Sequence, residues 1–191
     1  GERGYETMNA MHEHTTLDGE AHVCIRNVDT MDPFLMNIVS NGNLWIFAGS
    51  NGALTAGRRN PDTALFPYQT ADKLLRNPQN SGALTIFRSG PQGQETVWEP
   101  GCGEAIDGRI ARHLHKHVCG TSVVYQEIHE VLGLDFSWRL SSSQRFGLVR
   151  HCKLKNVGTH VRRVQYLDGW RHLLPYGVSQ ETYAAFSYLA A

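Results

Sequence analysis

The sequence predicts a mainly β fold, a two-sheet antiparallel β-sandwich with few helices. Strand-like segments follow one another from residue 110 to residue 167, with too little chain between them for crossover helices. Asn-Gly pairs at 41–42 and 51–52 separate short apolar runs between residues 34 and 57, as in a β-meander. A chain of 191 residues is long enough for one domain with a substantial core.

The remaining elements follow from the same patterns. Residues 58–81 carry several prolines and predict an ordered connection with one helical turn at 70–75. The turn at 155–158 is expected to close a hairpin. Further strands are expected at 83–88, 96–98, 110–119, 122–131, 134–140, 146–154 and 160–167.

Three segments make up the expected domain organisation. Residues 1–20 are polar and unpatterned and predict a flexible N-terminal arm, followed by the sandwich domain at 21–177. Residues 178–191 predict the start of a helical linker, with Ser179 as the N-cap and Glu181 in the first turn. Because this helix stops without a C-cap signal, we expect a truncated chain that continues in the parent protein.

The composition indicates which classes of partner are not expected. Lys plus Arg and Asp plus Glu number 18 each, so a nucleic-acid partner is not expected. No apolar run approaches the ~20 residues of a membrane span, so no membrane partner is expected either. The cysteines form no CxxC pair, which favours reduced thiols and a cytoplasmic location; they are Cys24, Cys102, Cys119 and Cys152.

Two stretches carry a family resemblance. Residues 40–75 (SNGNLWIFAGSNGALTAGRRNPDTALFPYQTADKLL) and 136–175 (from FSWRL to RHLLP) resemble the N-terminal region of large bacterial proteins related to cellobiose phosphorylase and other glycoside hydrolases or phosphorylases. The order of parts is also similar, since a succession of strands runs into a helix. The resemblance implies a galactose mutarotase-like β-supersandwich that is followed by linker helices and an (α/α)6 barrel.

The resemblance also implies a function. In that family the catalytic groups lie on the barrel, so no catalytic residue is carried over to this chain. The expected function is a non-catalytic N-terminal sandwich domain of a carbohydrate-active enzyme, which shapes the substrate entrance and packs against other domains. The expected partners are carbohydrate through the parent protein, its C-terminal helical-barrel domain and a second copy in a homodimer. No cofactor is expected.

Candidate acid/base groups form no pattern above background. Glycoside hydrolysis needs two carboxylates at a defined separation. Glu127 and His129 share strand parity, as in a mutarotase-like sugar site, but this is common on solvated strands. No GxSxG, Walker or GxGxxG motif occurs. The candidate carboxylates are Glu127, Glu130, Asp135 and Asp168.

Ligand-binding residues are expected in two loops. Arg58 precedes a proline-bearing connection that contains Tyr68, and a guanidinium beside a tyrosine suits a polar ligand. Asp168 and Trp170 are expected at the exit from the last strand, where loops present functional groups. The alternative interpretation of Arg58 is a salt bridge that pins an ordered loop. Trp45 and Trp138 are expected in the core.

A histidine-rich strand supports the alternative function. On a strand, His113, His115, His117 and Cys119 share one face, and all are residue types that bind zinc. Same-face residues are nearly ~7 Å apart, so only an adjacent pair reaches one ion without help from another strand. The competing interpretation is a solvated polar face. The alternative function is therefore a free-standing carbohydrate-binding or metal-dependent module.

Overall fold

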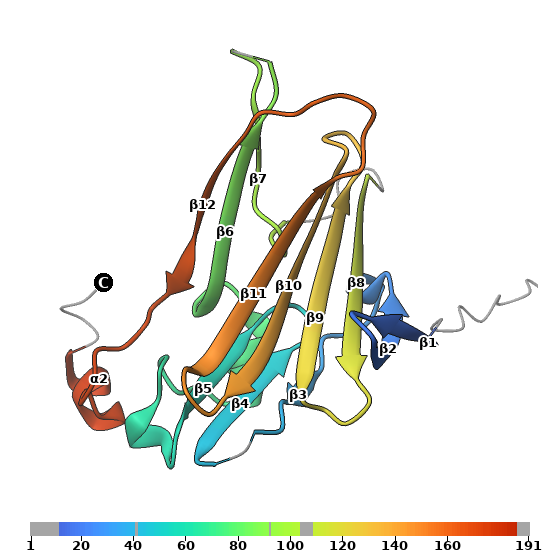
Figure 1. The fold of residues 1–191 in the computed structure, drawn as a ribbon. Helices are drawn as coiled ribbons and strands as arrows, with labels where there is room; N and C mark the ends of the chain where they lie inside the picture. The colour runs from blue at the N-terminus through green and yellow to red at the C-terminus, as the bar shows by residue number, and fades with distance from the viewer. Residues whose placement is uncertain (1–11, 41, 92, 104–108, 187–191) are drawn as a thin grey trace, which may run out of the picture.

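The computed structural model describes residues 12–40, 42–91, 93–103 and 109–186, and they form three antiparallel sheets (Figure 1). The predicted mainly β class is confirmed. The largest sheet contains, in spatial order, β1 (His12–Leu17), β2 (Glu20–Arg26), β8 (Ile110–His117), β9 (Ser122–His129), β10 (Leu134–Ser143) and β11 (Gly147–Asn156).

Two smaller sheets face the six-stranded sheet. One has the spatial order β3 (Leu35–Asn37), β4 (Leu44–Gly49) and β5 (Leu54–Arg58), and the other β12 (Val164–Arg171), β6 (Gly82–Ser89) and β7 (Thr96–Trp98). The helices are short: η1 (Val28–Thr30), η2 (Pro61–Thr63), α1 (Ala71–Arg76) and α2 (Gln180–Phe186). No helix in these described ranges is long and apolar enough to span a membrane.

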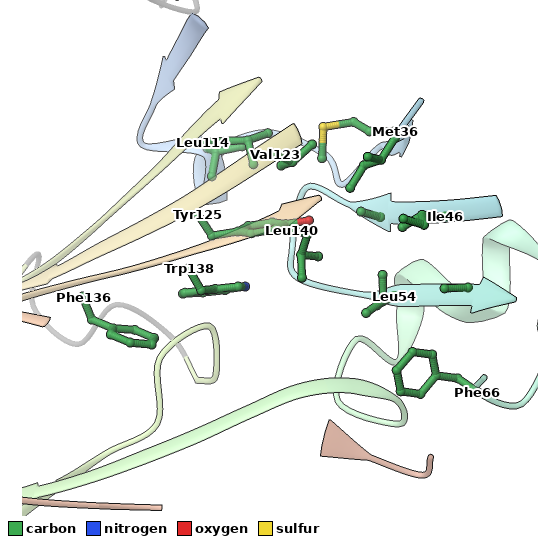
Figure 2. Close-up of a cluster of buried hydrophobic side chains, with 14 of the residues drawn as sticks. Met36, Ile46, Leu54, Phe66, Leu114, Val123, Tyr125, Phe136, Trp138 and Leu140 are labelled. Atoms are coloured by element: carbon green, nitrogen blue, oxygen red, sulfur yellow. The ribbon is translucent and has the colours of Figure 1, made fainter. Parts of the chain in front are cut away.

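The core lies between the two layers. Leu114, Tyr125 and Trp138 are directly opposite one another on β8, β9 and β10, so they point to the same face of the sheet. Figure 2 shows these side chains opposite Ile46 and Leu54 of the second layer. Fully burying each such aliphatic side chain contributes about 1.5–3 kcal/mol. The Tyr125 hydroxyl also donates a hydrogen bond to the Gly49 carbonyl at 2.7 Å, which joins the layers.

The flexible arm expected over residues 1–20 is wrong from His12 onward. Residues 12–17 form β1, which pairs with β2 from His12 opposite Ile25 to Leu17 opposite Glu20. The turn between them is Asp18-Gly19, and both residues have positive φ, as a two-residue hairpin requires. Residues 1–11 lie outside the described residues.

The hairpin expected at 155–158 is also wrong. The Val157 and Gly158 N–H groups donate to the Gly133 carbonyl at 2.8 and 3.0 Å, and the chain then crosses to the other layer. There β12 pairs with β6, not with β11. A Cβ atom on Gly133 would lie 2.9 Å from Gly158 Cα, so the crossing depends on two glycines in close approach.

The helical predictions are confirmed in the described residues. The turn expected at 70–75 is α1, and the C-terminal helix is α2. The Ser179 hydroxyl accepts a hydrogen bond from the Thr182 N–H at 3.1 Å, as an N-cap does. Residues 187–191 of the expected linker lie outside the described residues.

Candidate functional site

A cavity of about 190 Å³ opens between the layers beside η1. Its walls come from the η1 segment, from the β4–β5 turn at 50–52, from Gly101 in the loop after β7, and from β8, β9 and β10. Segments far apart in sequence therefore meet at one opening. Among the cavities of the described residues, this one combines buried charges with aromatic walls, so we treat it as the candidate site.

Glu127 of β9 is the buried charge of the site, with 1% of its surface exposed. Its carboxylate accepts hydrogen bonds from Trp98 Nε1 at 2.6 Å, from the Gly101 N–H at 2.8 Å and from Arg112 Nε at 2.8 Å. Such a carboxylate is compensated by three donors, one of them charged. Its bonds and its burial make it an anchor for its neighbours and not an acid or base open to substrate.

Arg112 of β8 connects this anchor to the opening. Its Nε contacts Glu127, and its Nη2 donates to the Cys102 carbonyl at 3.1 Å. Its Nη1 lies 3.8 Å from Asp29 Oδ2, and the Asp29 side chain is 28% exposed. This outer pair is too long for a direct hydrogen bond, so the Asp29 carboxylate retains acceptor capacity toward the cavity.

Aromatic rings form the inner wall. Tyr125 stacks on Trp138, with ring centroids 4.9 Å apart and an interplanar angle of 13°. Burial raises the pKa of the Tyr125 hydroxyl, which remains a hydrogen-bond donor. Gly101 has φ +80°, and a Cβ atom on it would lie 3.7 Å from the Trp138 ring. Gly101 thus lies beside the indole, and its N–H donates to Glu127.

The remaining wall is apolar. Val28, Met31 and Pro33 line the cavity beside Asp29. The arrangement combines an aromatic and aliphatic lining with a carboxylate acceptor and a guanidinium group. This chemistry suits a small ligand with an apolar face and several hydroxyl groups.

The first predicted pair, Arg58 and Tyr68, lies outside this cavity. Arg58 ends β5 at the surface, where its Nη1 is 3.4 Å from Asn43 Oδ1. Tyr68 is 41% exposed, and its ring meets the edge of Trp45 at a centroid distance of 6.0 Å. No hydrogen bond or ring contact joins the two side chains among the described residues.

Asp168 and Trp170 lie within β12 and not in a loop after it. Asp168 accepts hydrogen bonds from Arg150 Nη1 at 2.7 Å and from the Thr85 hydroxyl at 2.6 Å. Trp170 packs on Phe66 at 5.7 Å between ring centroids, and the Arg150 guanidinium lies 5.9 Å from its ring centroid. The two residues therefore take part in an interlayer contact around Arg150, which brings together two of the four predicted binding residues.

The other candidate carboxylates serve local contacts or lie at the surface. Both oxygens of Asp135 accept hydrogen bonds from Gln126 Nε2, at 3.1 and 3.0 Å. The Gln126 Oε1 accepts from His115 Nε2 at 3.2 Å. Glu130 is exposed in the β9–β10 turn. Neither Asp135 nor Glu130 lines the candidate cavity.

The predicted histidine face forms in part. His113, His115 and His117 all lie on β8, whereas Cys119 lies beyond its end in the following turn. The imidazoles have separate partners: the Asn27 N–H donates to His113 Nδ1 at 3.2 Å, and the Cys119 N–H donates to His117 Nδ1 at 3.1 Å. Within the ranges that the structure describes, no three His, Cys, Asp or Glu side chains are arranged to bind one metal ion.

The charged residues of the site that the sequence reasoning missed are Asp29 and Arg112. A usable signal exists for Arg112, because it has the same strand parity as Leu114, whose neighbours predict an inward face. An inward arginine needs a buried carboxylate partner, which Glu127 provides on the next strand. Asp29 gave no such signal, because its position depends on how η1 folds against β8.

Comparison with known proteins does not identify a family for this chain. No protein-family model matches the chain, and no curated protein matches its sequence. The resemblance to the cellobiose phosphorylase-related family therefore depends on the two quoted stretches alone.

Proposed function

We propose that this chain is a non-catalytic β-sandwich domain of a larger carbohydrate-active protein of the glycoside hydrolase or phosphorylase type. In this proposal the cavity beside η1 binds one sugar ring. The observation that carries it is the joint presence of the Tyr125–Trp138 wall and the Arg112–Asp29 pair at a single opening.

The size of the cavity supports a small saccharide. Its volume of about 190 Å³ is below the roughly 300–1,000 Å³ of pockets that take drug-sized ligands. A sugar ring has an apolar face of C–H groups and a rim of hydroxyls, so it matches an aromatic wall with polar groups beside it. The mutarotase-like sandwich expected from the resemblance is consistent with this assignment.

The role of the domain follows from the same groups. Glu127 is held by three donors and almost fully buried, so we assign it a structural role and assign the site a binding function. Sugar binding by a domain without catalytic groups would position a chain end near a separate catalytic domain. We therefore propose a role in shaping the substrate entrance of the parent protein.

Titration of the labelled protein with glucose and cellobiose, followed by amide chemical shifts, tests the proposal. We expect saturable shifts at 28–33, 50–52 and around Arg112. Asp29→Asn should weaken binding by about tenfold, because a charged acceptor is lost at the opening. Asp62→Asn, a matched change in η2 outside the cavity, should leave binding unchanged.

The alternatives are distinguished by the same titration. The absence of saturable shifts with either sugar would contradict the proposal. Equal weakening by Asp29→Asn and Asp62→Asn would also contradict it, since the effect would then be one of general charge.

A further inference from the structure

A second cavity lies on the outer face of the six-stranded sheet, away from the core. Ser137 and Arg139 flank the inward-pointing Trp138 on β10, so their side chains point to the outer face. Gln126 lies directly opposite Ser137 on β9 and shares that face. These three side chains line a cavity of about 100 Å³, which we call the outer cavity.

The β1–β2 turn forms one side of the outer cavity. Asp18 of this turn lines it, and the Arg139 guanidinium holds the turn against the sheet. Arg139 Nη2 is 3.1 Å from Asp18 Oδ2, and Nη1 is 3.2 Å from Glu20 Oε2. His115 and Asp135, which also line the cavity, are only 8% and 9% exposed, although both lie on the outer face. The outer cavity therefore has buried polar groups on its walls.

A chain of hydrogen bonds fixes the protonation of His115. Because a carboxylate only accepts, the Gln126 Nε2 group donates to both oxygens of Asp135, at 3.1 and 3.0 Å, and Gln126 Oε1 faces His115. An amide oxygen also only accepts, so His115 Nε2, 3.2 Å away, carries the proton. Burial lowers the pKa of His115, which keeps the imidazole neutral at neutral pH. The other ring nitrogen, Nδ1, is therefore an acceptor.

This acceptor lacks a donor. His115 Nδ1 is buried and has no hydrogen-bond partner among the described residues. Buried side-chain polar atoms are paired in the large majority of cases. Since His115 lines the outer cavity, a ligand with an O–H group can supply the donor from there.

The rim of the outer cavity offers the opposite chemistry. Lys153 and Lys155 of β11 line the same cavity and are exposed. Among the residues that the structure describes, neither ammonium group forms an ion pair or a hydrogen bond. The nearby carboxylates are engaged, since Asp18 contacts Arg139 and Asp135 accepts two hydrogen bonds. The free groups at the rim are therefore cationic donors, which suit a carboxylate.

We propose that the outer cavity binds a small hydroxycarboxylate, a ligand with one carboxylate and at least one hydroxyl on a short carbon chain. A ligand hydroxyl donates to His115 Nδ1, and the carboxylate accepts from Lys153 and Lys155. The volume of about 100 Å³ is well below the roughly 300–1,000 Å³ of pockets for drug-sized ligands, so it admits only a few carbon atoms. This site lies on the other face of the sheet from the proposed sugar cavity and does not depend on it.

The buried Asp135 argues against other small occupants. Inorganic phosphate would bring its charge next to that carboxylate, whereas a hydroxyl group can approach it without repulsion. A metal ion is not supported, because no three His, Cys, Asp or Glu side chains of the described ranges are arranged to bind one. A hydroxycarboxylate satisfies the inner acceptor and the outer cations together.

Three small molecules separate the two contributions. Glycerate carries hydroxyls and a carboxylate, propionate lacks the hydroxyls, and glycerol lacks the carboxylate. Titration followed by amide chemical shifts should show saturable shifts with glycerate at 135–139 and 151–155. Propionate and glycerol should bind at least about tenfold more weakly, because each loses one set of hydrogen bonds.

The histidine ring nitrogens report on the inner contact directly. In protein with isotope-labelled histidine, His115 should carry its proton on Nε2 and none on Nδ1 at neutral pH. Glycerate should shift the Nδ1 resonance of His115, and propionate should not, because it has no hydroxyl to donate. His129 is the internal control, since its Nδ1 already accepts from the Leu132 N–H at 3.3 Å.

Lysine variants test the outer contact. Lys153→Met with Lys155→Met should weaken glycerate binding by about tenfold and leave glycerol binding unchanged. Both positions are exposed, so the fold should tolerate the changes. Lys73→Met with Arg76→Met removes the same charge from α1, outside the outer cavity, and should have no effect on glycerate binding.

Several results would overturn the proposal. Equal affinities for glycerate and propionate would mean that the lysines attract anions without His115. Tighter binding of inorganic phosphate than of glycerate would assign the outer cavity to phosphate. A proton on His115 Nδ1 in the free protein would remove the acceptor, and the absence of saturable shifts with glycerate would remove the ligand. Equal weakening by the two double variants would reduce the effect to general charge.

Discussion

Phe136 of β10 and Leu154 of β11 are both large apolar residues on the inward face of the six-stranded sheet, but they differ in burial. Phe136 of β10 is 2% exposed, whereas Leu154, directly opposite it on β11, is 38% exposed. The difference comes from the sheet order, because β10 has neighbours on both sides and β11 has one. Position within the sheet thus separates the packed Phe136 from the exposed Leu154 on the edge strand.

The two regions also differ in how they hold a charged pair. In the packed region Glu127 accepts hydrogen bonds from Trp98, Gly101 and Arg112 and is almost fully buried. On the edge strand β12, Asp168 keeps 36% of its side chain exposed beside Arg150. Water can replace part of the second interaction but none of the first, so the consequences of breaking them should differ.

Removal of the two carboxylates should show the largest contrast. Glu127→Ala should lower the free energy of unfolding by about 3–5 kcal/mol, because the donors of Trp98, Gly101 and Arg112 lose their buried acceptor. Asp168→Ala should cost about 1–2 kcal/mol, since Asp168 is more than a third exposed and Arg150 keeps its hydrogen bond to the Thr85 hydroxyl. Urea unfolding of both variants gives the comparison. Equal losses would mean that the Arg150–Asp168 pair is as closed to solvent as the Glu127 contacts.

The same contrast applies to a matched pair of leucines. Leu54 on β5 is fully buried, and Leu167 on β12 is 56% exposed. Leu54→Ala should cost about 2–5 kcal/mol through lost burial and a cavity. Leu167→Ala should stay within about 0.5 kcal/mol. A large loss at Leu167 would show that the outer face of β12 is covered in solution.

Local sequence patterns predicted most strands, because alternation and turn residues act within a few positions. The Asn-Gly pair at 51–52 and the apolar runs on either side of it correctly indicated β4 and β5. The pairing of β12 with β6 was not predictable in this way. It joins segments about eighty residues apart, and no local pattern states which partner a strand takes.

The candidate site was predicted only in part for the same reason. Glu127 drew attention as a carboxylate, but its role depends on the donors that Trp98 and Gly101 bring from another sheet and a loop. Asp168 and Trp170 were expected in a loop because the predicted strand ended at residue 167, whereas β12 continues to Arg171. The alternation of side chains along β12 continues to Arg171. Because Tyr166 and Leu167 point to opposite faces and are both apolar and exposed, the apolar/polar alternation that identifies a strand is weak there.

The smallest expected effect is a dependence of stability on pH, which should come from the packed sheet. Burial lowers the pKa of His115 on β8, and the nearby His113, His22 and Arg26 charges lower it further, against a hydrogen bond to Gln126 that raises it. The unfolded chain therefore binds a proton more readily than the folded protein.

The sign of the effect follows from that difference. The contribution of His115 is fully present above its unfolded pKa of about 6.5 and is lost as the pH falls from there toward the lower folded value. Urea unfolding at about pH 7 and about pH 5 should thus show lower stability in acid. His115→Gln should reduce this difference. The control is His160→Gln, which removes an exposed imidazole from the connection between β11 and β12. If both variants changed the pH dependence equally, the effect would not come from burial in the packed sheet.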